Sequence, residues 1–344
     1  MSVKEKTPFE AFLDTHDDGA WAATVQELLP SIHEVDRTAT QVWFRFFPVA
    51  LLRAFEQSED PARLAQRLLM QGRWYLKDQS DSSHTFFYGH RFWPETKRAV
   101  IRAAESGVKP GAALADVVRE VARAVASERK VDESLAAGIA AAGLMTLQQT
   151  GLAEFRRTQG EVLIDRAHMK RTPEEILRER AKGDSQGLFG FLRTADKNWT
   201  VVWDENRDDR RFKAVDSQEV ASGAATDKRP WHEQDERCTV NEGPIPVQCR
   251  SASCGTCWVG VLGGAEKLSE VDWRERKMMP LFGYVDTEEP RPLIRLSCQA
   301  RASGAVSVVI PPWNGYFGKH LKRLSEGGGG EAAGEETESE AVAG

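Results

Sequence analysis

The residues of this chain with the clearest chemical potential are five cysteines. They lie at positions 238, 249, 254, 257 and 298, and residues 1–237 contain none. Cys249, Cys254 and Cys257 form a C-x4-C-x2-C run, and Cys298 follows after 40 intervening residues. Thiolates bind iron or zinc, and pairs of thiols form disulfides. The spacing of the cysteines is therefore used to distinguish an iron site, a zinc site and a set of disulfides.

The spacing fits an iron–sulfur cluster of the 2Fe-2S type, which needs two thiolates at each iron. A compact loop supplies three sulfurs, and a distant strand end supplies the fourth. The residues between the loop cysteines are small or flexible, so backbone N–H groups can approach the sulfurs; they are Ser251, Ala252, Ser253, Gly255 and Thr256. The sequence thus predicts a 2Fe-2S cluster with the ligands Cys249, Cys254, Cys257 and Cys298.

Three other uses of the cysteines remain open. Zinc also accepts four thiolates, but four-cysteine zinc sites usually combine two C-x2-C knuckles, whereas Cys298 stands alone. A disulfide framework is disfavoured by the odd cysteine count. The fifth residue, Cys238, is interpreted as an ordinary small thiol, with a redox-sensitive thiol beside the cluster as its functional alternative.

The segment Cys-Arg-Ser-Ala-Ser-Cys-Gly-Thr-Cys at 249–257 resembles the cluster-binding loop of plant-type 2Fe-2S ferredoxins. The stretch 272–279, the Leu-Phe-Gly-Tyr at 281–284 and the Arg-Leu-Ser-Cys-Gln at 295–299 resemble adrenodoxin-like members of the same superfamily. The resemblance covers about residues 190–315. It implies a β-grasp fold, the same four iron ligands and a low-potential one-electron couple.

The sequence departs from this family in three places. The gap before Cys298 is longer than usual, Ser251-Ala252-Ser253 occupies the place of a usual glycine, and residues 222–245 form an insertion before the first ligand. These departures affect the reduction potential and the partner surface, because both depend on hydrogen bonds to sulfur and on local charge. None of them removes a ligand.

Residues 1–164 carry helical signals almost throughout. Thr7 before Pro8 is typical of an N-cap followed by a first-turn proline, and Gly151 stands where a glycine would end a helix. Residues 165–187 are strongly charged and include a capping box, Thr172-Pro173-Glu174-Glu175, which predicts a linker helix ending at Gly183. A surface helix that belongs to one domain is the alternative for this segment.

Strand patterns begin only after Gly190. Residues 199–203 and 211–215 are predicted to pair as a hairpin, and residues 306–310 form a further strand before Pro311. The expected fold class is α+β, with an N-terminal all-α helical domain followed by a β-grasp ferredoxin-like domain. The predicted parts are a helical domain at 1–164, a charged linker helix at 165–187, the 2Fe-2S domain at 188–324 and a disordered acidic tail at 325–344.

Charge and composition exclude several classes of function. The formal net charge of −6 is matched by six glutamates in the tail, so the remainder is neutral and nucleic-acid binding is disfavoured. The uncharged stretch 134–153 is rich in Ala and Gly and is interpreted as a core helix rather than a membrane span. The absence of a secretory signal favours a cytoplasmic location.

The leading hypothesis for function is one-electron transfer, by a carrier or an electron-transfer subunit whose helical domain docks an unidentified redox partner protein. An iron–sulfur sensor or assembly protein is the first alternative. The second is an oxidoreductase with an unrecognised cofactor near His33, His84 and His90, because imidazoles ligate haem and metals. The chain shows no Gly-x-Gly-x-x-Gly or Walker motif and no recognisable catalytic set, so its status as an enzyme stays open.

Overall fold

The structure is a computed structural model that describes residues 6–46, 59–60, 76–182, 197–279 and 288–312. Three sequence predictions lie outside the described residues: the disordered tail at 325–344, the end of the linker helix at Gly183, and the Leu-Phe-Gly-Tyr segment at 281–284. The described part has the α+β class predicted from the sequence, with helices first and a mixed sheet afterwards.

The N-terminal region is helical, as predicted. Its helices are α1 (Pro8–Asp14), α2 (Asp18–Leu28), α3 (Glu34–Phe46), α6 (Trp93–Ser106), α7 (Leu114–Arg129), α8 (Ser134–Arg157) and α9 (Pro173–Lys182), with the 3-10 turns η1 (Leu29–Ser31), η2 (Leu76–Gln79), η3 (Tyr88–Phe92) and η4 (His168–Lys170). The Thr7 hydroxyl accepts the N–H of Glu10, and the Glu10 carboxylate accepts the N–H of Thr7. This reciprocal capping starts α1 at the predicted place.

Helix α8 is the core helix that the Ala- and Gly-rich stretch predicts. Residues 136–147 are all buried, and a Cβ at Gly138 would lie only 2.5 Å from the Thr40 hydroxyl of α3. The glycine therefore allows α3 and α8 to approach closely. Gly151 has φ +77° and breaks the helical geometry inside α8, in agreement with its expected role at a helix end. In the described part of the chain, no helix is long and apolar enough to span a membrane.

The C-terminal region contains a five-stranded mixed sheet with the order β3-β2-β8-β5-β6. Its strands are β2 (Asn198–Val202), β3 (Arg211–Val215), β5 (Trp258–Gly263), β6 (Ile294–Leu296) and β8 (Val306–Val309). The hairpin of β2 and β3 is antiparallel, as predicted, and β8 lies parallel to β2. A last strand that returns parallel to the first, at the centre of the sheet, is the arrangement of a β-grasp fold.

Short elements complete this region. They are β4 (Gln218–Glu219), which pairs with β7 (Arg301–Ala302), and α10 (Val220–Ala224), α11 (Trp231–Gln234), η6 (Ala265–Lys267) and α12 (Trp273–Met278). Helix α10 packs against β3. Helix α12 starts where the Asp272 carboxylate accepts the N–H of Glu275.

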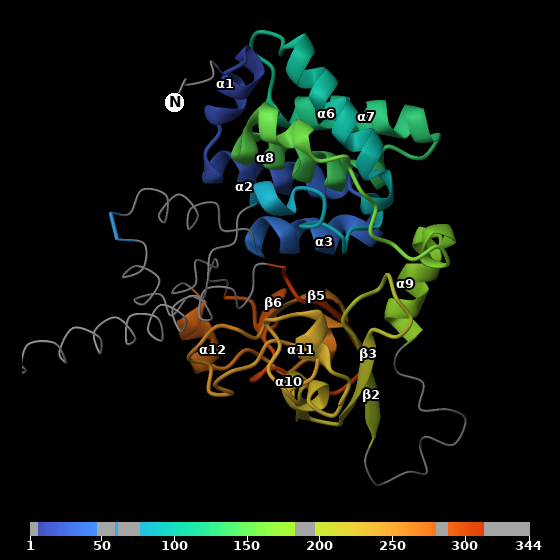
Figure 1. Cartoon of the computed structure of the whole chain (residues 1–344), viewed down its shortest axis with the longest axis vertical. Helices are drawn as coiled ribbons and strands as arrows, with labels where there is room; N and C mark the ends of the chain where they lie inside the picture. Colours follow the sequence, from blue (N-terminus) through green and yellow to red (C-terminus); the bar gives the residue numbers. More distant parts are fainter. Residues whose placement is uncertain (1–5, 47–58, 61–75, 183–196, 280–287, 313–344) are drawn as a thin grey trace, which may run out of the picture.

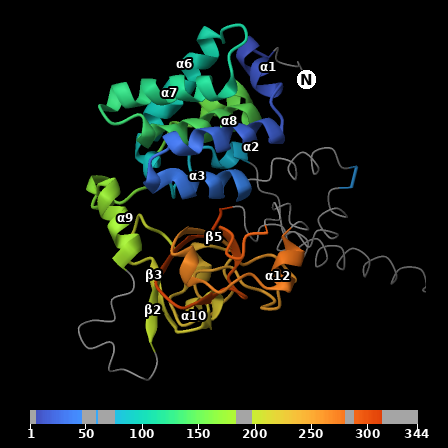
Figure 2. The same ribbon diagram turned by 180° about the vertical axis from the view of Figure 1, so that it is seen from behind.

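The helical region is stacked directly on the sheet (Figures 1 and 2). Helix α3 lies at the boundary and contacts β5 and β6. Every residue of β5 from Trp258 to Leu262 is buried, so both faces of this strand are covered. The buried apolar residues of the two regions form one continuous core. Strand β5, which follows Cys257, and strand β6, which precedes Cys298, are therefore covered by the helical region.

Helix α9 connects the two regions through a buried ion pair. The Arg180 guanidinium donates to both carboxylate oxygens of Glu205, at 2.7 and 2.8 Å, and to the carbonyl of Val35 at 3.0 Å. The Ser307 hydroxyl of β8 also donates to Glu205, at 2.6 Å. Burial raises the pKa of Glu205, but Arg180 outweighs that effect and holds the pKa below its ordinary value. One arginine thus joins α3, α9 and the sheet.

Candidate functional site

The structure brings the four predicted cysteine ligands together at one end of the sheet. Cys249, Cys254 and Cys257 lie in the loop that leads into β5, and Cys298 follows β6. Strands β5 and β6 pair with Trp258 opposite Leu296, and the N–H of Ser297 donates to the carbonyl of Cys257 at 3.0 Å. The antiparallel pairing therefore places Cys257 next to Cys298, across 40 residues of sequence.

The loop between Cys249 and Cys257 turns its backbone N–H groups toward sulfur. The N–H groups of Ser251, Ser253 and Cys254 donate to Cys249 Sγ at 3.4, 3.4 and 3.3 Å. The turn uses left-handed backbone conformations, with φ of +54° at Arg250, +62° at Ala252 and +64° at Gly255. Successive N–H groups in such a turn form a concave site for negative charge. The loop thus favours a thiolate at Cys249.

Ala252 belongs to the stretch Ser251-Ala252-Ser253, which departs from the ferredoxin loop that the segment resembles, because that loop usually places a glycine there. Ala252 has a left-handed φ and is 3% exposed. Alanine can adopt this conformation at a cost of about 1–2 kcal/mol. The loop therefore keeps a glycine-like path without the glycine.

The thiols form two pairs, Cys249 with Cys254 and Cys257 with Cys298. A hydrogen bond from the Cys254 thiol, with further ones from Ser253 and Ser251, lowers the pKa of Cys249 to about 3. The same bond raises the pKa of Cys254. In the second pair, Cys257 lowers the pKa of Cys298 to about 7, and Cys298 raises the pKa of Cys257. Within each pair one thiol favours the ionised form of the other, and iron binding would displace the protons that remain on the four sulfurs.

This arrangement fits a 2Fe-2S cluster. Two pairs of thiols match two thiolates at each of two irons, and the backbone donors at Cys249 supply the hydrogen bonds that stabilise negative charge on sulfur. Among the described residues, no three or more His, Cys, Asp or Glu side chains form a group that could hold a metal ion, and the four cysteines stand two and two. The pair of Cys249 and Cys254 is partly exposed, and the pair of Cys257 and Cys298 is buried.

A buried ion pair supports the strand that carries Cys298. The Arg295 guanidinium donates to the two Glu275 carboxylate oxygens at 2.8 and 3.0 Å, and the N–H of Leu296 donates to Glu275 at 2.6 Å. Both side chains are fully shielded from solvent, with exposed fractions of 1% and 0%. Arg295 also donates to the carbonyl of Ser269 at 2.7 Å. The two residues could not be paired from the sequence, because their separation of 20 positions follows no helix or strand period.

The fifth cysteine lies apart from this site. Cys238 is buried, and its thiol donates to the carbonyl of Pro244 at 3.3 Å. It lines a separate cavity of about 290 Å³, together with Trp203 and Trp231. This environment agrees with the interpretation of Cys238 as an ordinary buried thiol.

His84 and His90 of the helical region are buried and bonded to each other. Their Nδ1 atoms are 3.1 Å apart, His84 Nε2 contacts the carbonyl of Ser80 at 3.2 Å, and His90 Nε2 accepts the N–H of Leu163 at 3.0 Å. His84 must therefore donate through Nε2 and accept through Nδ1, and His90 must donate through Nδ1. All four ring nitrogens are engaged in hydrogen bonds. Burial lowers the pKa of both imidazoles, that of His90 to about 4.

His33 does not join this pair. Its Nδ1 accepts the N–H of Val35 at the start of α3. The structure thus brings together only two of the three histidines that suggested a cofactor in the helical region, and their nitrogens are bonded within the protein.

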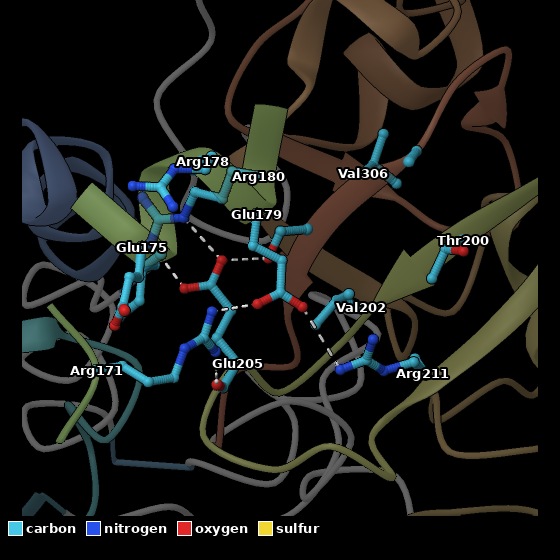
Figure 3. Close-up of a pocket in the computed structure, with 13 residues that line it drawn as sticks. Arg171, Glu175, Arg178, Glu179, Arg180, Thr200, Val202, Glu205, Arg211 and Val306 are labelled. Carbon is cyan, nitrogen blue, oxygen red and sulfur yellow. Dashed lines mark hydrogen bonds and ion pairs between the residues drawn. The ribbon is translucent and has the colours of Figure 1, made fainter. Parts of the chain in front are cut away.

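A second cavity, of about 530 Å³, lies where α9 meets β2 and β8 (Figure 3). Val202 and Val306 contribute apolar surface, and arginines alternate with glutamates around it. Arg171 and Arg211 both form ion pairs with Glu179, and Arg180 is bonded to Glu205. The charges of this cavity are largely neutralised within the protein, and its contacts connect α9 with the sheet.

Comparison with known families identifies the region that contains the cysteines. Residues 234–303 match the model of the 2Fe-2S iron-sulfur cluster binding domain. Searches of the curated proteins and of the solved structures give no match. The matched segment includes all four paired cysteines. Residues 234–303 are therefore a 2Fe-2S cluster binding domain, and the cofactor of this region is a 2Fe-2S cluster.

Proposed function

We propose that this protein transfers single electrons through a 2Fe-2S cluster held by Cys249, Cys254, Cys257 and Cys298, as a carrier or as an electron-transfer subunit. The observation that carries the proposal is the geometry of the four cysteines: the loop N–H groups converge on Cys249 Sγ, and the pairing of β5 with β6 places Cys257 next to Cys298. When bound, a 2Fe-2S cluster accepts and releases one electron. Plant-type or adrenodoxin-like ligation is the subtype that the loop spacing supports.

The chain's own residues supply the environment for that electron. The three backbone N–H donors at Cys249 Sγ stabilise added negative charge without any movement of the loop. Cys249 and Cys254 are partly exposed, and Arg250, Ser251 and Ser253 beside them are exposed. Strands β5 and β6, which adjoin Cys257 and Cys298, are covered by α3 of the helical region. We therefore assign electron exchange with the redox partner to the face formed by residues 249–254.

The experiment that tests this function is anaerobic purification followed by iron and sulfide analysis and electron paramagnetic resonance after reduction. We expect two iron and two sulfide per chain and a one-electron signal of the reduced cluster. The reduction potential should be on the order of −400 mV. Stoichiometric zinc, or a potential above zero, would contradict the proposal.

The division of the chain remains part of the proposal: a helical domain at 1–164, a linker helix at 165–187, the cluster domain at 188–324 and a tail at 325–344. A fragment that starts at residue 188 retains all four proposed ligands, Cys249, Cys254, Cys257 and Cys298. We expect this fragment to bind the cluster. It should be less stable than the full chain, because it lacks Arg180, the partner of the buried Glu205, and the α3 cover of β5. Iron content and thermal unfolding of both proteins measure the difference. Partner docking by the helical domain and a cytoplasmic location remain predictions.

A further inference from the structure

Gln299, which directly follows the fourth cysteine, bridges two parts of the cluster site. Its side-chain Nε2 lies 3.3 Å from Cys298 Sγ, 2.8 Å from the carbonyl of Cys298 and 3.4 Å from the carbonyl of Arg250. The sulfur, as a thiolate, and both carbonyls are acceptors, so the amide nitrogen rather than the amide oxygen must face them. The side chain thus connects the isolated Cys298 segment with the loop that holds the other three cysteines.

We propose that Gln299 is a positioning residue that raises the reduction potential of the cluster by donating a hydrogen bond from Nε2 to Cys298 Sγ. This inference rests on the proposed function. Reduction places additional negative charge on the cluster and its sulfur ligands. A donor at a ligand sulfur stabilises the reduced form more than the oxidised form. Removal of the donor should therefore lower the potential.

Both Cys249 Sγ and Cys298 Sγ receive main-chain donors, and Cys298 Sγ receives the Gln299 amide in addition. Cys249 Sγ receives three N–H groups of the main chain, which a side-chain substitution does not remove. Cys298 Sγ receives the backbone N–H of Ala252 and, in addition, the side-chain amide of Gln299, which a substitution can remove. The potential can therefore be tuned at Cys298 without a change in the path of the cluster loop.

The surroundings of Cys298 make this hydrogen bond effective. Cys298 is 5% exposed, so water competes little for its sulfur. Cys298 and Gln299 lie at the edge of a polar cavity of about 420 Å³ that is also lined by Arg250, Arg274 and Arg301. Loss of the amide would leave Cys298 Sγ with the backbone N–H of Ala252 but without its side-chain donor.

The experiment compares three variants of the full-length holoprotein by spectroelectrochemical titration. Gln299→Leu removes the donor at similar size, and Gln299→Glu replaces the amide with a negative charge. Gln248→Leu is the matched control, because the exposed Gln248 precedes Cys249 as Gln299 follows Cys298. At the wild-type midpoint potential, the reduced-to-oxidised ratio should fall about tenfold in Gln299→Leu, which is ~59 mV for one electron. The reduced-to-oxidised ratio should fall further in Gln299→Glu, because the variant places a negative charge beside the sulfur. The ratio should stay unchanged in Gln248→Leu.

Each outcome decides the proposal. A Gln299→Leu protein with full cluster content and the wild-type potential overturns it, as does a shift of equal size in Gln248→Leu. If Gln299→Leu loses its cluster, the potential of Gln299→Glu decides. If both Gln299 variants lose the cluster, Gln299 has a purely structural role. That result also overturns the proposal that Gln299 raises the reduction potential. Failure of the proposed function is recognised separately, because wild-type protein would then lack two iron and two sulfide per chain.

Discussion

The cluster domain and the helical region both contain pairs of side chains of types that can bind metals, but the surroundings of the pairs differ. In the cluster domain, Cys249 pairs with Cys254 in the loop before β5 and Cys257 pairs with Cys298 beside β6, and we propose these four thiols as the iron ligands. In the helical region, His84 and His90 also pair, but each ring nitrogen has a protein partner. A metal-binding residue type becomes a ligand only where the fold leaves its lone pairs available.

The largest expected effect comes from removing one member of a thiol pair. Cys298→Ala should abolish the cluster, because one iron then has a single protein thiolate. Cys238→Ala should retain it, because the Cys238 thiol is bonded to the carbonyl of Pro244 instead. Iron and sulfide content and the visible absorption of both variants check this prediction. Loss of the cluster in Cys238→Ala would show that the fifth cysteine belongs to the site.

The second largest effect concerns the unfolding free energy, and it tests whether the helical region and the sheet region unfold independently. Arg180→Met leaves Glu205 as a buried charge without its partner and should cost about 3–5 kcal/mol of unfolding free energy. The double variant Arg180→Met/Glu205→Met should recover part of that loss. Thermal unfolding followed by both far-ultraviolet circular dichroism and cluster absorbance measures the coupling. Two separate transitions already present in the wild type would contradict a shared core.

A third prediction concerns the left-handed backbone at Ala252. Ala252→Val should lower the cluster content, because a β-branched residue is strongly disfavoured at φ +62° and the site is 3% exposed. The expected cost is about 2–4 kcal/mol. Ala252→Gly is the matched control and should retain the cluster. Iron content and the rate of iron release to a chelator compare the two variants, and equal cluster retention in both would contradict the prediction.

The smallest effect is the pH dependence of the histidine pair. Burial lowers the pKa of folded His90 to about 4, from about 6.5 in the unfolded chain. Its stabilising contribution is therefore complete above pH 6.5 and is lost as the pH falls toward 4. At pH 5 this loss is about 2 kcal/mol.

His90→Gln should show a smaller fall in unfolding free energy between pH 8 and pH 5 than the wild type. Denaturation followed by far-ultraviolet circular dichroism measures that fall, and the difference at pH 8 records the packing cost of the substitution alone. Equal falls in both proteins would mean that His90 is not held in its neutral form.

The local features of this protein were predictable because they depend on neighbours in sequence. The C-x4-C-x2-C run identified three cysteines of the site, and the helix caps at Thr7 and Thr172 form where their motifs predict. The hairpin of β2 and β3 forms at the predicted residues. Small residues between the cysteines indicated a loop with available N–H groups, and the structure places three of them on Cys249 Sγ.

The contacts between distant residues were not predictable, because no period of a helix or strand relates them. Glu275 reaches Arg295 across 20 positions, and Arg180 reaches Glu205 across 25 and Val35 across 145. The histidines show the same limit, since their sequence was compatible with metal binding until the fold supplied a partner for each nitrogen.

The sequence by itself determined the chemistry of the cysteines and the change from helices to strands, because both follow from residue type and short-range spacing. Only the tertiary structure decided which thiols pair, because the pairing of Cys257 with Cys298 depends on the register of β5 and β6. It also decided that the helical region covers those strands through α3. The physical reason is that burial, ion pairing and sulfur hydrogen bonds arise from groups that meet only after the chain has folded.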